Sequence, residues 1–389
     1  MKRLLIVQYA GDYRESDRLR REEGKEIYYG HGYVLDQLEA VAATGVEVGF
    51  LCCLAPKYEE RLPNGIVAIG TATNPDRNPR PVIEALAKFR PTHLWIQGPM
   101  PSLIRWGLKH SGAAEMAVVL ADSFANRFYR WLRFDKLPPM LRDPRVTLIA
   151  NHGANAARAL VELGVDAGRV IPWDYPHVRT PDQWPAKARA EGPPFELLYV
   201  GSVSKKKGVG DLIDAVARLV PALDLRLTVA GVGKIEMFEK LAARRGIADR
   251  VRFLGLVPNN EIPAMMHRAA AVVVPSRHSF PEGLPLTLYE ALSSRTPVIA
   301  SDHPMFGGHL VDGESAMIFP AGNAGALAAA IEDVLTRPDL YERLSAGAPE
   351  AWARMQNPVK WGEMVARWVR GEPADRDWLA AHSVAHLPR

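Results

Sequence analysis

The chain has 389 residues, of which 48% are hydrophobic and 24% are charged, with 31 glycines and 31 prolines. That length exceeds a single comfortable hydrophobic core, so we expect two globular domains with many turns. The formal net charge of +4 suits a phosphorylated small molecule or an anionic membrane surface as partner but requires neither, and we expect no nucleic-acid partner.

The cysteines and the N-terminal segment bear on the cellular compartment. The two cysteines, Cys52 and Cys53, are adjacent in a predicted strand and point to opposite faces, which favours buried thiols over a disulfide. The apolar run after the N-terminal basic pair is too short for a signal peptide, and no stretch approaches the roughly 20 apolar residues of a spanning helix. We therefore expect a cytoplasmic protein, with peripheral contact at the inner face of a membrane as an open alternative.

The first half of the chain alternates apolar strand-like runs with amphipathic helices. This alternation predicts βαβ units with right-handed crossovers and a parallel sheet. Residues 11–26 are unusually charged, and both a solvated helix or loop and an acceptor-binding or membrane-facing segment fit them. Strands are expected at 4–7, 46–53, 66–69, 92–97, 116–121, 146–150 and 169–172, and helices at 34–44, 81–89, 101–110, 123–132 and up to residue 160.

Two glycines, Gly30 and Gly32, lie just before the helix expected at 34–44. Small residues at this place allow close approach of a ligand, so both are candidate binding residues. The pattern is weak as a motif, because it lacks the third glycine of a dinucleotide fingerprint and does not directly follow a strand.

A proline-rich stretch separates the two halves. Residues 172–195 carry six prolines and no apolar period, which is typical of an interdomain linker. We place a first Rossmann-like domain at 1–178, a linker at 179–195 and a second Rossmann-like domain at 196–357. A C-terminal helix within 358–389 is expected to pack back on the first domain. Two such halves are expected to face a central cleft at the carboxyl ends of both sheets.

The second half repeats the strand-helix alternation. Its strands are expected at 196–200, 225–230, 251–254, 270–275 and 298–300, and its helices at 210–220, 235–245, 260–268, 286–293 and 324–335.

The most informative stretch of the second half, residues 280–290, contains two glutamates eight positions apart. Glu282 and Gly283 fall in the turn between the buried strand at 270–275 and the helix that follows, at the carboxyl edge of the sheet. Backbone amides at such a helix start favour an anion, typically phosphate. Glu290 falls in the second helical turn, where it can face the same crevice. We expect one glutamate to face a sugar and the other a ribose.

This organisation resembles the GT-B glycosyltransferases, specifically the retaining family-4 group. The family signature is an acidic residue followed eight positions later by a glutamate, and Glu282 and Glu290 match it. Flanking matches at 273–277, 290–300 and 312–319 make the pattern specific. The resemblance is strong over roughly residues 195–350 and holds only in outline for the N-terminal half.

The resemblance implies a role for each residue of a donor site. Glu290 would accept hydrogen bonds from the ribose hydroxyls of a sugar nucleotide, and Glu282 would contact the transferred sugar. The backbone around Gly283, Leu284 and Pro285 would hold the diphosphate, and Gly30 and Gly32 are candidate contacts from the first half.

The basic pair that the family uses for the diphosphate is incomplete in this chain. Lys207 matches the lysine and is expected to act in catalysis, but Ser202 stands where the family carries an arginine. A serine donates one hydrogen bond and brings no charge to the departing diphosphate. Lys205 or Lys206 could compensate, or both belong to a solvated lysine run.

Two further positions depart from the family pattern. Many members carry a histidine after the strand that here ends at residue 121, and this chain has Asp122. Asp122 could contact a sugar hydroxyl as a catalytic residue or simply cap the following helix. His309, preceded by two glycines, stands where the family often has a glutamate.

No metal and no cofactor are expected, because the sugar nucleotide is a substrate. Asp375 and Asp377 form the one Asp-x-Asp triplet, which we place in a solvated tail, and no His-Glu-x-x-His or Cys-x-x-Cys pattern occurs.

By this resemblance the chain is a metal-independent retaining hexosyltransferase of the kind used in polysaccharide biosynthesis. It would move a sugar from a nucleoside-diphosphate donor to a glycan, a lipid-linked sugar or a small metabolite. Three alternatives remain: a nucleotide-sugar epimerase or hydrolase of similar fold, a dinucleotide-dependent oxidoreductase, and a two-lobed ligand-binding protein.

Overall fold

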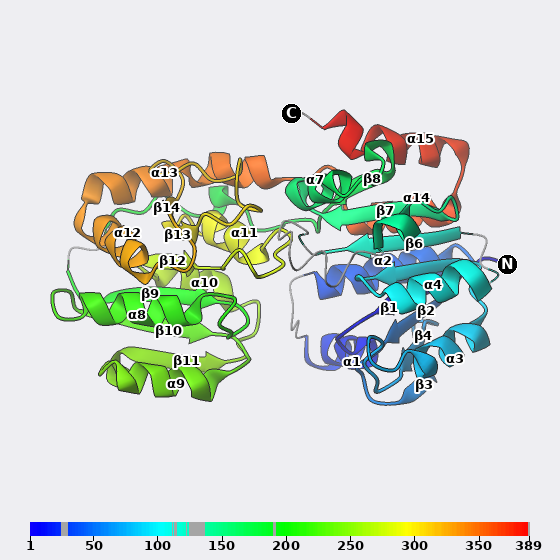
Figure 1. Ribbon diagram of the computed structural model, residues 1–389, viewed down its shortest axis with the longest axis horizontal. Coiled ribbons are helices and arrows are strands. Elements are labelled where there is room, and N and C mark those ends of the chain that lie inside the picture. The colour runs from blue at the N-terminus through cyan, green and yellow to red at the C-terminus, as the bar shows by residue number, and fades with distance from the viewer. Residues whose placement is uncertain are drawn as a thin grey trace. The chain divides into compact units, whose positions relative to one another are not determined.

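The computed structural model describes residues 1–24, 30–110, 112, 115–121, 123, 137–189 and 192–387. The chain divides into two compact units (Figure 1). The first unit comprises Met1–Pro176 and Asn357–Arg389, and the second comprises His177–Gln356. The helix expected at 123–132 falls, apart from its first residue, outside the described residues.

The first unit is built on an eight-stranded sheet of order β3-β4-β2-β1-β5-β6-β7-β8. Every neighbouring pair of strands is parallel except β3 and β4. The strands are β1 (Arg3–Gln8), β2 (Glu47–Cys52), β3 (Tyr58–Arg61), β4 (Val67–Gly70), β5 (His93–Gln97), β6 (Glu115–Leu120), β7 (Val146–His152) and β8 (Val170–Trp173). The edge strand β3 was not expected from the sequence, because it carries three charged residues and owes its extended form to pairing with β4.

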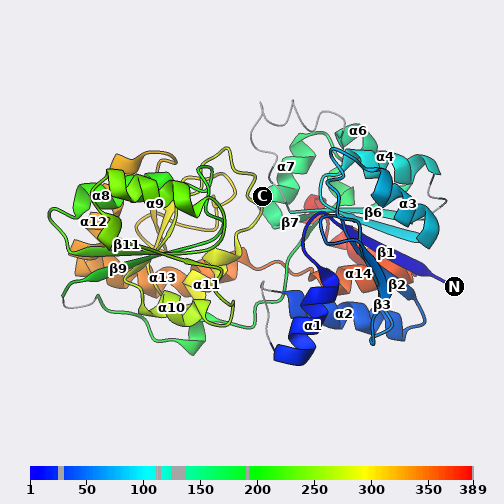
Figure 2. The same ribbon diagram turned by 90° about the horizontal axis from the view of Figure 1, so that it is seen from below.

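Helices cover both faces of this sheet. They are α1 (Tyr13–Glu23), α2 (His31–Ala43), α3 (Arg80–Phe89), α4 (Pro101–His110), α6 (Leu137–Leu141), α7 (Ala154–Glu162), α14 (Trp361–Arg370) and α15 (Pro373–Ala381), with short 3-10 turns η1 (Ala167–Arg169) and η4 (Val384–His386). Leu4 and Ile6 of β1 point into the layer that contains α2 and α14, whereas Leu5 and Val7 point into the layer that contains α3, α4 and α7. The two layers lie on opposite sides of the strands in Figure 2. Successive side chains point to opposite faces, and both faces are covered by helices. Both sets of side chains are therefore apolar, which explains why the buried strands read as continuous apolar runs.

The C-terminal segment completes the first unit. The rings of Trp361 and Trp368 of α14 pack edge-on against Trp95 of β5, with centroids 5.6 and 5.7 Å apart. Asp375, expected in a solvated tail, is instead buried in α15, where it pairs with Arg367 and Arg370. The expectation of a tail was wrong because a capping box between Glu372 and Asp375 starts this helix.

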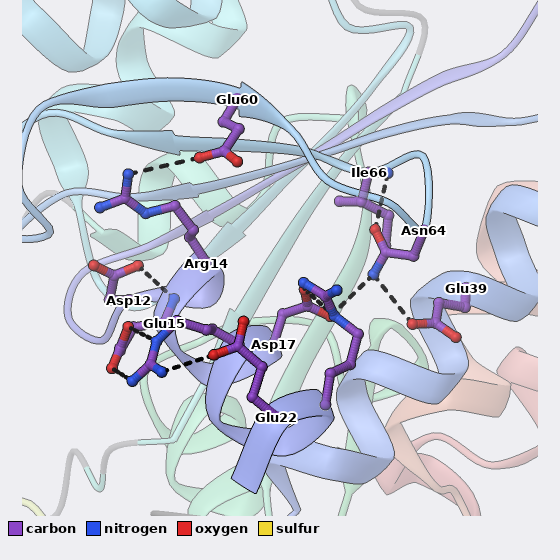
Figure 3. A network of polar contacts seen from close by, with 11 residues as sticks. Asp12, Arg14, Glu15, Asp17, Glu22, Glu39, Glu60, Asn64 and Ile66 are labelled. Atoms are coloured by element: carbon purple, nitrogen blue, oxygen red, sulfur yellow. Dashed lines mark hydrogen bonds and ion pairs between the residues drawn. The ribbon is translucent and has the colours of Figure 1, made fainter.

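A network of polar contacts fixes α1 to its neighbours (Figure 3). All four arginines of α1 pair with carboxylates: Arg14 with Glu60, Arg18 with Glu15, Glu22 and Glu23, Arg20 with Asp36, and Arg21 with Asp17. Asn64 donates to both Asp17 and Glu39, at 3.4 and 3.1 Å, and so links α1 to α2. The positive charges of α1 are therefore paired with carboxylates within the unit.

The second unit contains a parallel six-stranded sheet of order β11-β10-β9-β12-β13-β14. Its strands are β9 (Phe195–Val200), β10 (Leu225–Ala230), β11 (Val251–Gly255), β12 (Ala271–Val274), β13 (Val298–Ser301) and β14 (Met317–Phe319). Its helices are α8 (Val209–Leu219), α9 (Ile235–Arg244), α10 (Ile262–Arg268), α11 (Leu286–Ser293), α12 (Ala324–Thr336) and α13 (Pro338–Met355), with the 3-10 turns η2 (Pro181–Gln183) and η3 (Ala248–Arg250). In Figure 2, α8 and α9 lie on one side of the strands and α10 and α11 on the other.

The proline-rich segment that opens the second unit is held against α10. Lys187 donates from Nζ to the carbonyl oxygens of His267 and Ala269, at 2.7 and 2.6 Å, and so caps the C-terminus of the helix. Burial lowers the pKa of Lys187 to about 8. The ring of Trp184 stacks on His267 with centroids 3.9 Å apart. The segment expected to be a linker is therefore anchored along part of its length.

Candidate functional site

The strand order of the second sheet defines one place where a ligand would bind. The chain runs from β9 outward to β10 and β11, and then returns to the other side of β9 with β12. Ligands of open α/β sheets bind outside the carboxyl ends of the strands at such a reversal, the topological switch point. Here the turns that follow β9 and β12 meet, and they carry most of the residues that the sequence singled out.

Two backbone approaches require glycine in these turns. A Cβ atom on Gly208, whose φ is +74°, would lie 1.9 Å from the carbonyl oxygen of Pro275 after β12. A Cβ atom on Gly231, whose φ is +150°, would lie 1.8 Å from the carbonyl oxygen of Gly201 after β9. Only glycine tolerates both the conformation and the contact, so the turns pack directly on one another.

Lys207 and Glu282 form an ion pair at the centre of this switch point. Lys207 Nζ lies 2.5 Å from Glu282 Oε1, and the two side chains are only 16% and 6% exposed. Ser276 donates its hydroxyl to the same carboxylate oxygen at 2.6 Å, and the Lys207 ammonium lies 4.4 Å from the centre of the Phe280 ring. Charge-assisted bonds of this kind hold both groups in fixed positions.

His303 holds the turn that carries Glu282. Its Nδ1 accepts the N–H of Met305 at 3.2 Å, so Nε2 carries the proton and donates to the carbonyl oxygen of Phe280 at 3.0 Å. The N–H of Glu282 donates to the same carbonyl oxygen at 2.9 Å. Burial lowers the pKa of His303, which favours this neutral form.

Glu290 is a buried acid with an unused hydrogen-bond acceptor. It lies in the second turn of α11, is 10% exposed, and its Oε1 accepts no hydrogen bond within the described part of the chain. Burial raises the pKa of Glu290 to about 7, and the Arg179 guanidinium, 3.6 Å from Oε1, partly opposes that rise. A buried acceptor without a donor is costly unless a ligand supplies one, so Glu290 is suited to bind a hydroxyl.

The start of α11 offers free backbone donors beside these acids. Across the residues that the structure describes, neither the N–H of Gly283 nor that of Leu284 donates to a protein acceptor. Pro285 is the N-cap of α11, and Leu284 is buried. Ser202 has an exposed side chain, and its carbonyl oxygen accepts the Tyr199 hydroxyl at 2.8 Å. The arrangement can therefore receive an anion at the helix N-terminus next to Lys207.

The first unit has its own switch point, between β1 and β5. A cavity of about 240 Å³ lies there, lined by Gln8 and Gln97 at the ends of these strands, by Asp12 before α1, and by the rings of Tyr175 and Trp361. Gln97 Oε1 accepts the indole N–H groups of Trp95 and Trp361, at 3.1 and 3.4 Å, which orients its amide group. The lining thus combines aromatic walls with polar groups, as ligand sites commonly do.

The structure distributes the predicted site residues over both units. Lys207, Glu282, Gly283, Leu284, Pro285 and Glu290 come together in the second unit, with Ser202 on the first turn. Gly30 is the N-cap of α2 in the first unit with φ of +83°, where a Cβ atom would lie 2.9 Å from the Tyr175 ring, and Gly32 lies in the first turn of that helix. Asp122 lies outside the described residues. His309 is buried and contacts the carbonyl oxygen of Arg354.

Three residues of the second-unit site were not anticipated: Arg179, Ser276 and His303. Ser276 and His303 come within two residues of the carboxyl ends of β12 and β13, so strand ends were the signal that pointed to them. Arg179 lies in the segment taken as a linker and carried no such signal.

Among the described residues, no group of three or more His, Cys, Asp or Glu side chains is placed to hold a metal ion. No helix in the described ranges combines the length and apolarity that a membrane crossing requires.

Comparison with known proteins gives consistent results. The family model of glycosyl transferases group 1 matches residues 181–351. A D-inositol 3-phosphate glycosyltransferase of Thermomonospora curvata is 30% identical over 334 residues, which cover 77% of this chain and 74% of that protein. An alpha-D-kanosaminyltransferase of Streptomyces kanamyceticus is 33% identical over 154 residues, which cover 39% of each chain. A glycogen synthase of Mycobacterium tuberculosis is 31% identical over 205 residues, which cover 52% of this chain and 45% of that protein.

Solved structures share the fold over nearly the whole chain. A sucrose-phosphate synthase of Thermosynechococcus elongatus has a TM-score of 0.69 at 20% identity, covering 98% of this chain and all of that one. HepE of Anabaena in complex with UDP-glucose has a TM-score of 0.67 at 14% identity, covering 95% of this chain and 99% of that one. At these identities the likeness concerns the fold.

Proposed function

We infer that this chain, which belongs to the glycosyl transferases group 1 family, transfers a sugar from a nucleoside-diphosphate sugar to an acceptor hydroxyl. Family membership rests on the family model and on the relative from Thermomonospora curvata. The GT-B fold expected from the sequence, with two Rossmann-like parallel-sheet domains, is confirmed by the strand orders and the similar solved structures.

One observation supports the donor site above all others. At the second-unit switch point, a lysine-glutamate pair, free amides at a helix start and a buried acid with an unused acceptor converge. These groups match the parts of a sugar nucleotide: Glu282 for the sugar, Lys207 and the amides around Gly283 and Leu284 for the diphosphate, and Glu290 for the ribose hydroxyls. A complex of a fold relative with UDP-glucose supports the same class of ligand.

The proposed reaction is a transfer with retention at the anomeric carbon and without a metal ion. The bond between the anomeric carbon and the diphosphate oxygen breaks, and the acceptor oxygen forms a new bond to that carbon on the same face. The acceptor proton passes to a phosphate oxygen of the leaving group. Lys207 and the N-terminus of α11 stabilise the negative charge that grows on the diphosphate as the sugar becomes cation-like. Ser202 adds a hydrogen bond to phosphate but no charge.

The acceptor is proposed to bind in the first unit, at the β1/β5 cavity. The matched relatives are named for transfer involving D-inositol 3-phosphate, phosphatidyl-myo-inositol and kanosamine. A cyclitol or sugar, either free or as part of a glycan or lipid-linked molecule, is therefore the proposed acceptor class. Asp122 is proposed to contact a sugar hydroxyl.

Two measurements test the proposed function. Thermal unfolding with UDP, GDP and ADP should show that at least one of them stabilises the chain. The matching sugar nucleotides should then release nucleoside diphosphate only when an acceptor is added, and EDTA should leave the rate unchanged. Release of the sugar without any acceptor would instead identify a hydrolase or epimerase, and failure of all three nucleotides to bind would refute the donor site.

A further inference from the structure

We propose that the cavity at the β1/β5 switch point binds an uncharged polyol ring and that Asp12 excludes acceptors with a phosphate on that ring. The proposal rests on the proposed function, because it names the class of acceptor for the same reaction. It concerns the first unit alone and is testable without the donor.

The size of the cavity limits its occupant to about one ring. Its volume of about 240 Å³ lies below the range of roughly 300–1,000 Å³ that is typical of sites for drug-sized ligands. The rings of Tyr175 and Trp361 line it, and flat aromatic surfaces suit the C–H face of a sugar or cyclitol. A single six-membered polyol ring is therefore compatible with the volume and the aromatic lining of the cavity.

Two side-chain oxygens of the cavity lining can accept hydrogen bonds from a ligand. Gln8 uses its amide N–H to bond the carbonyl oxygen of Ala10 at 2.7 Å, which leaves its own carbonyl oxygen available. Asp12 Oδ1 accepts the N–H of Glu15 at 3.1 Å and the hydroxyl of Tyr58 at 2.7 Å, and its second oxygen has no partner within the described ranges. A ligand that satisfies these two oxygens must bring hydrogen-bond donors, and hydroxyl groups are donors that carry no charge.

The charge of the cavity opposes a phosphate. Of the described residues that line it, none is a lysine or an arginine, and Asp12 is a carboxylate. His31 is the one basic side chain in that lining, and its Nδ1 lies 3.5 Å from the Ser16 hydroxyl. A phosphate beside Asp12 would bring two negative charges close together in a partly buried place, so its binding would be disfavoured relative to that of an uncharged ring.

Asp12 cannot easily turn away from the cavity. It is the N-cap of α1. The ion pair between Arg14 and Glu60 fixes that helix to the edge strand, and the hydrogen bonds of Asn64 to Asp17 and Glu39 link it to α2 (Figure 3). Burial and the hydrogen bond to Asp12 raise the pKa of the Tyr58 hydroxyl, so this donor stays protonated. The carboxylate is therefore held in place as a specificity-determining group.

The test is direct binding of acceptors, measured by ligand-observed NMR without donor. The probes are myo-inositol, mannose and glucose, each paired with its phosphate monoester. We expect at least one uncharged ring to bind the wild-type protein about 10-fold more tightly than its phosphate ester. Asp12→Asn keeps the N-cap acceptor. This variant should bind the uncharged ring more weakly, and its preference for that ring over the phosphate ester should fall by about 10-fold. Glu22→Gln removes a charge from the same helix outside the cavity and should change neither.

The outcomes separate this inference from the proposed function. Tighter binding of a phosphate ester to the wild-type protein, binding of no uncharged ring, or an unchanged preference in Asp12→Asn would overturn the inference. Titration with UDP, GDP and ADP on the same samples reports on the donor site independently. Nucleotide binding with a preference for phosphorylated rings would retain the proposed function and reject only the neutral acceptor.

Discussion

The two switch points of the molecule have the same topology and opposite chemistry. In each sheet the first strand of the unit, β1 or β9, lies inside the sheet. The strands that follow it are added first on one side and then on the other, and the turns at this reversal carry the polar groups. The second unit places a buried ion pair, free amides and a buried acid there. The first unit places amides, aromatic rings and one carboxylate in a small cavity.

Under the proposed function, this difference would divide a two-substrate reaction between the two units. Strand order determines where a ligand can bind, whereas the side chains on the turns determine which ligand binds. Charge is needed where a diphosphate leaves, and it is a disadvantage where a neutral hydroxyl must be held. If that division is correct, variants of the second unit should affect the donor and variants of the first unit should affect the acceptor.

The largest expected effect is loss of transfer in Lys207→Ala. The ammonium group lies 2.5 Å from Glu282. Removing a group that stabilises transition-state charge typically costs 100- to 1,000-fold in rate. The measurement is nucleotide release with saturating donor and acceptor. Lys205→Ala removes an exposed lysine from the same turn and is the matched control. Equal activity of the two variants would remove Lys207 from the mechanism.

A smaller loss is expected for His303→Ala. The Phe280 carbonyl oxygen would lose one of its two hydrogen-bond donors, the His303 ring. The turn that carries Glu282 would then be held less firmly, and the sugar would be positioned less accurately. We expect kcat to fall about 10-fold while nucleotide affinity stays within about twofold, because Glu290 is not on this turn. His303→Gln keeps an amide donor and should recover part of the rate. A loss of nucleotide affinity equal to the loss in kcat would contradict this positioning role.

Glu290→Gln should weaken nucleotide binding by about 10-fold, the effect of losing a hydrogen bond to a charged group. Because burial raises the pKa of Glu290 to about 7, a proton is available for release near neutral pH. Ribose hydroxyls that donate to the carboxylate favour its charged form, so nucleotide binding should release protons. Calorimetry in two buffers of different ionisation enthalpy measures this release, which should vanish in Glu290→Gln. Proton uptake by the wild-type protein would contradict the assignment.

The same residue predicts the direction of a pH effect on stability. The folded pKa of Glu290 lies above its value of 4.5 in the unfolded chain, so the native state binds more protons between these values. Its contribution to stability is complete below about pH 4.5 and is lost as the pH rises through about 7. Denaturant unfolding of wild type and Glu290→Gln should therefore be compared between pH 5 and pH 8. The free energy of unfolding of the wild type should fall relative to that of the variant as the pH rises. A difference that is constant with pH would argue against a buried, raised acid.

The smallest effect is expected for Ser202→Arg. This change restores the charge that the family carries on the first turn, at a position where the side chain is exposed and only the carbonyl oxygen is bonded. Nucleoside diphosphates should bind about threefold more tightly, and uncharged acceptors should bind as before. Isothermal titration measures both. Unchanged nucleotide affinity would place the diphosphate away from this turn.

The sequence predicted the fold well because both sheets are buried on two faces. Runs such as 271–274 and 4–7 read as strands without ambiguity, and glycine turns separated them from the helices. Edge strand β3 and helix α15 were missed, because the first depends on pairing with β4 and the second on a cap that carries little apolar signal.

The candidate site was only partly predictable. Lys207, Glu282 and Glu290 were found through the family pattern, which fixes residue types at set distances along the chain. Arg179 and His303 were missed because their contacts, with Glu290 and the Phe280 carbonyl oxygen respectively, arise only on folding. The cavity beside Asp12 was missed because it depends on β1 lying next to β5, which is a property of strand order rather than of any local pattern.

The most direct test of the division between the two switch points is calorimetric titration of UDP, GDP and ADP into four proteins: wild type, Lys207→Ala, Glu290→Gln and Asp12→Asn. We predict that at least one nucleotide binds the wild type. Both second-unit variants should bind that nucleotide about 10-fold or more weakly, and Asp12→Asn should bind it with the affinity of the wild type. Equal weakening by Asp12→Asn, or unchanged binding in both second-unit variants, would contradict the account.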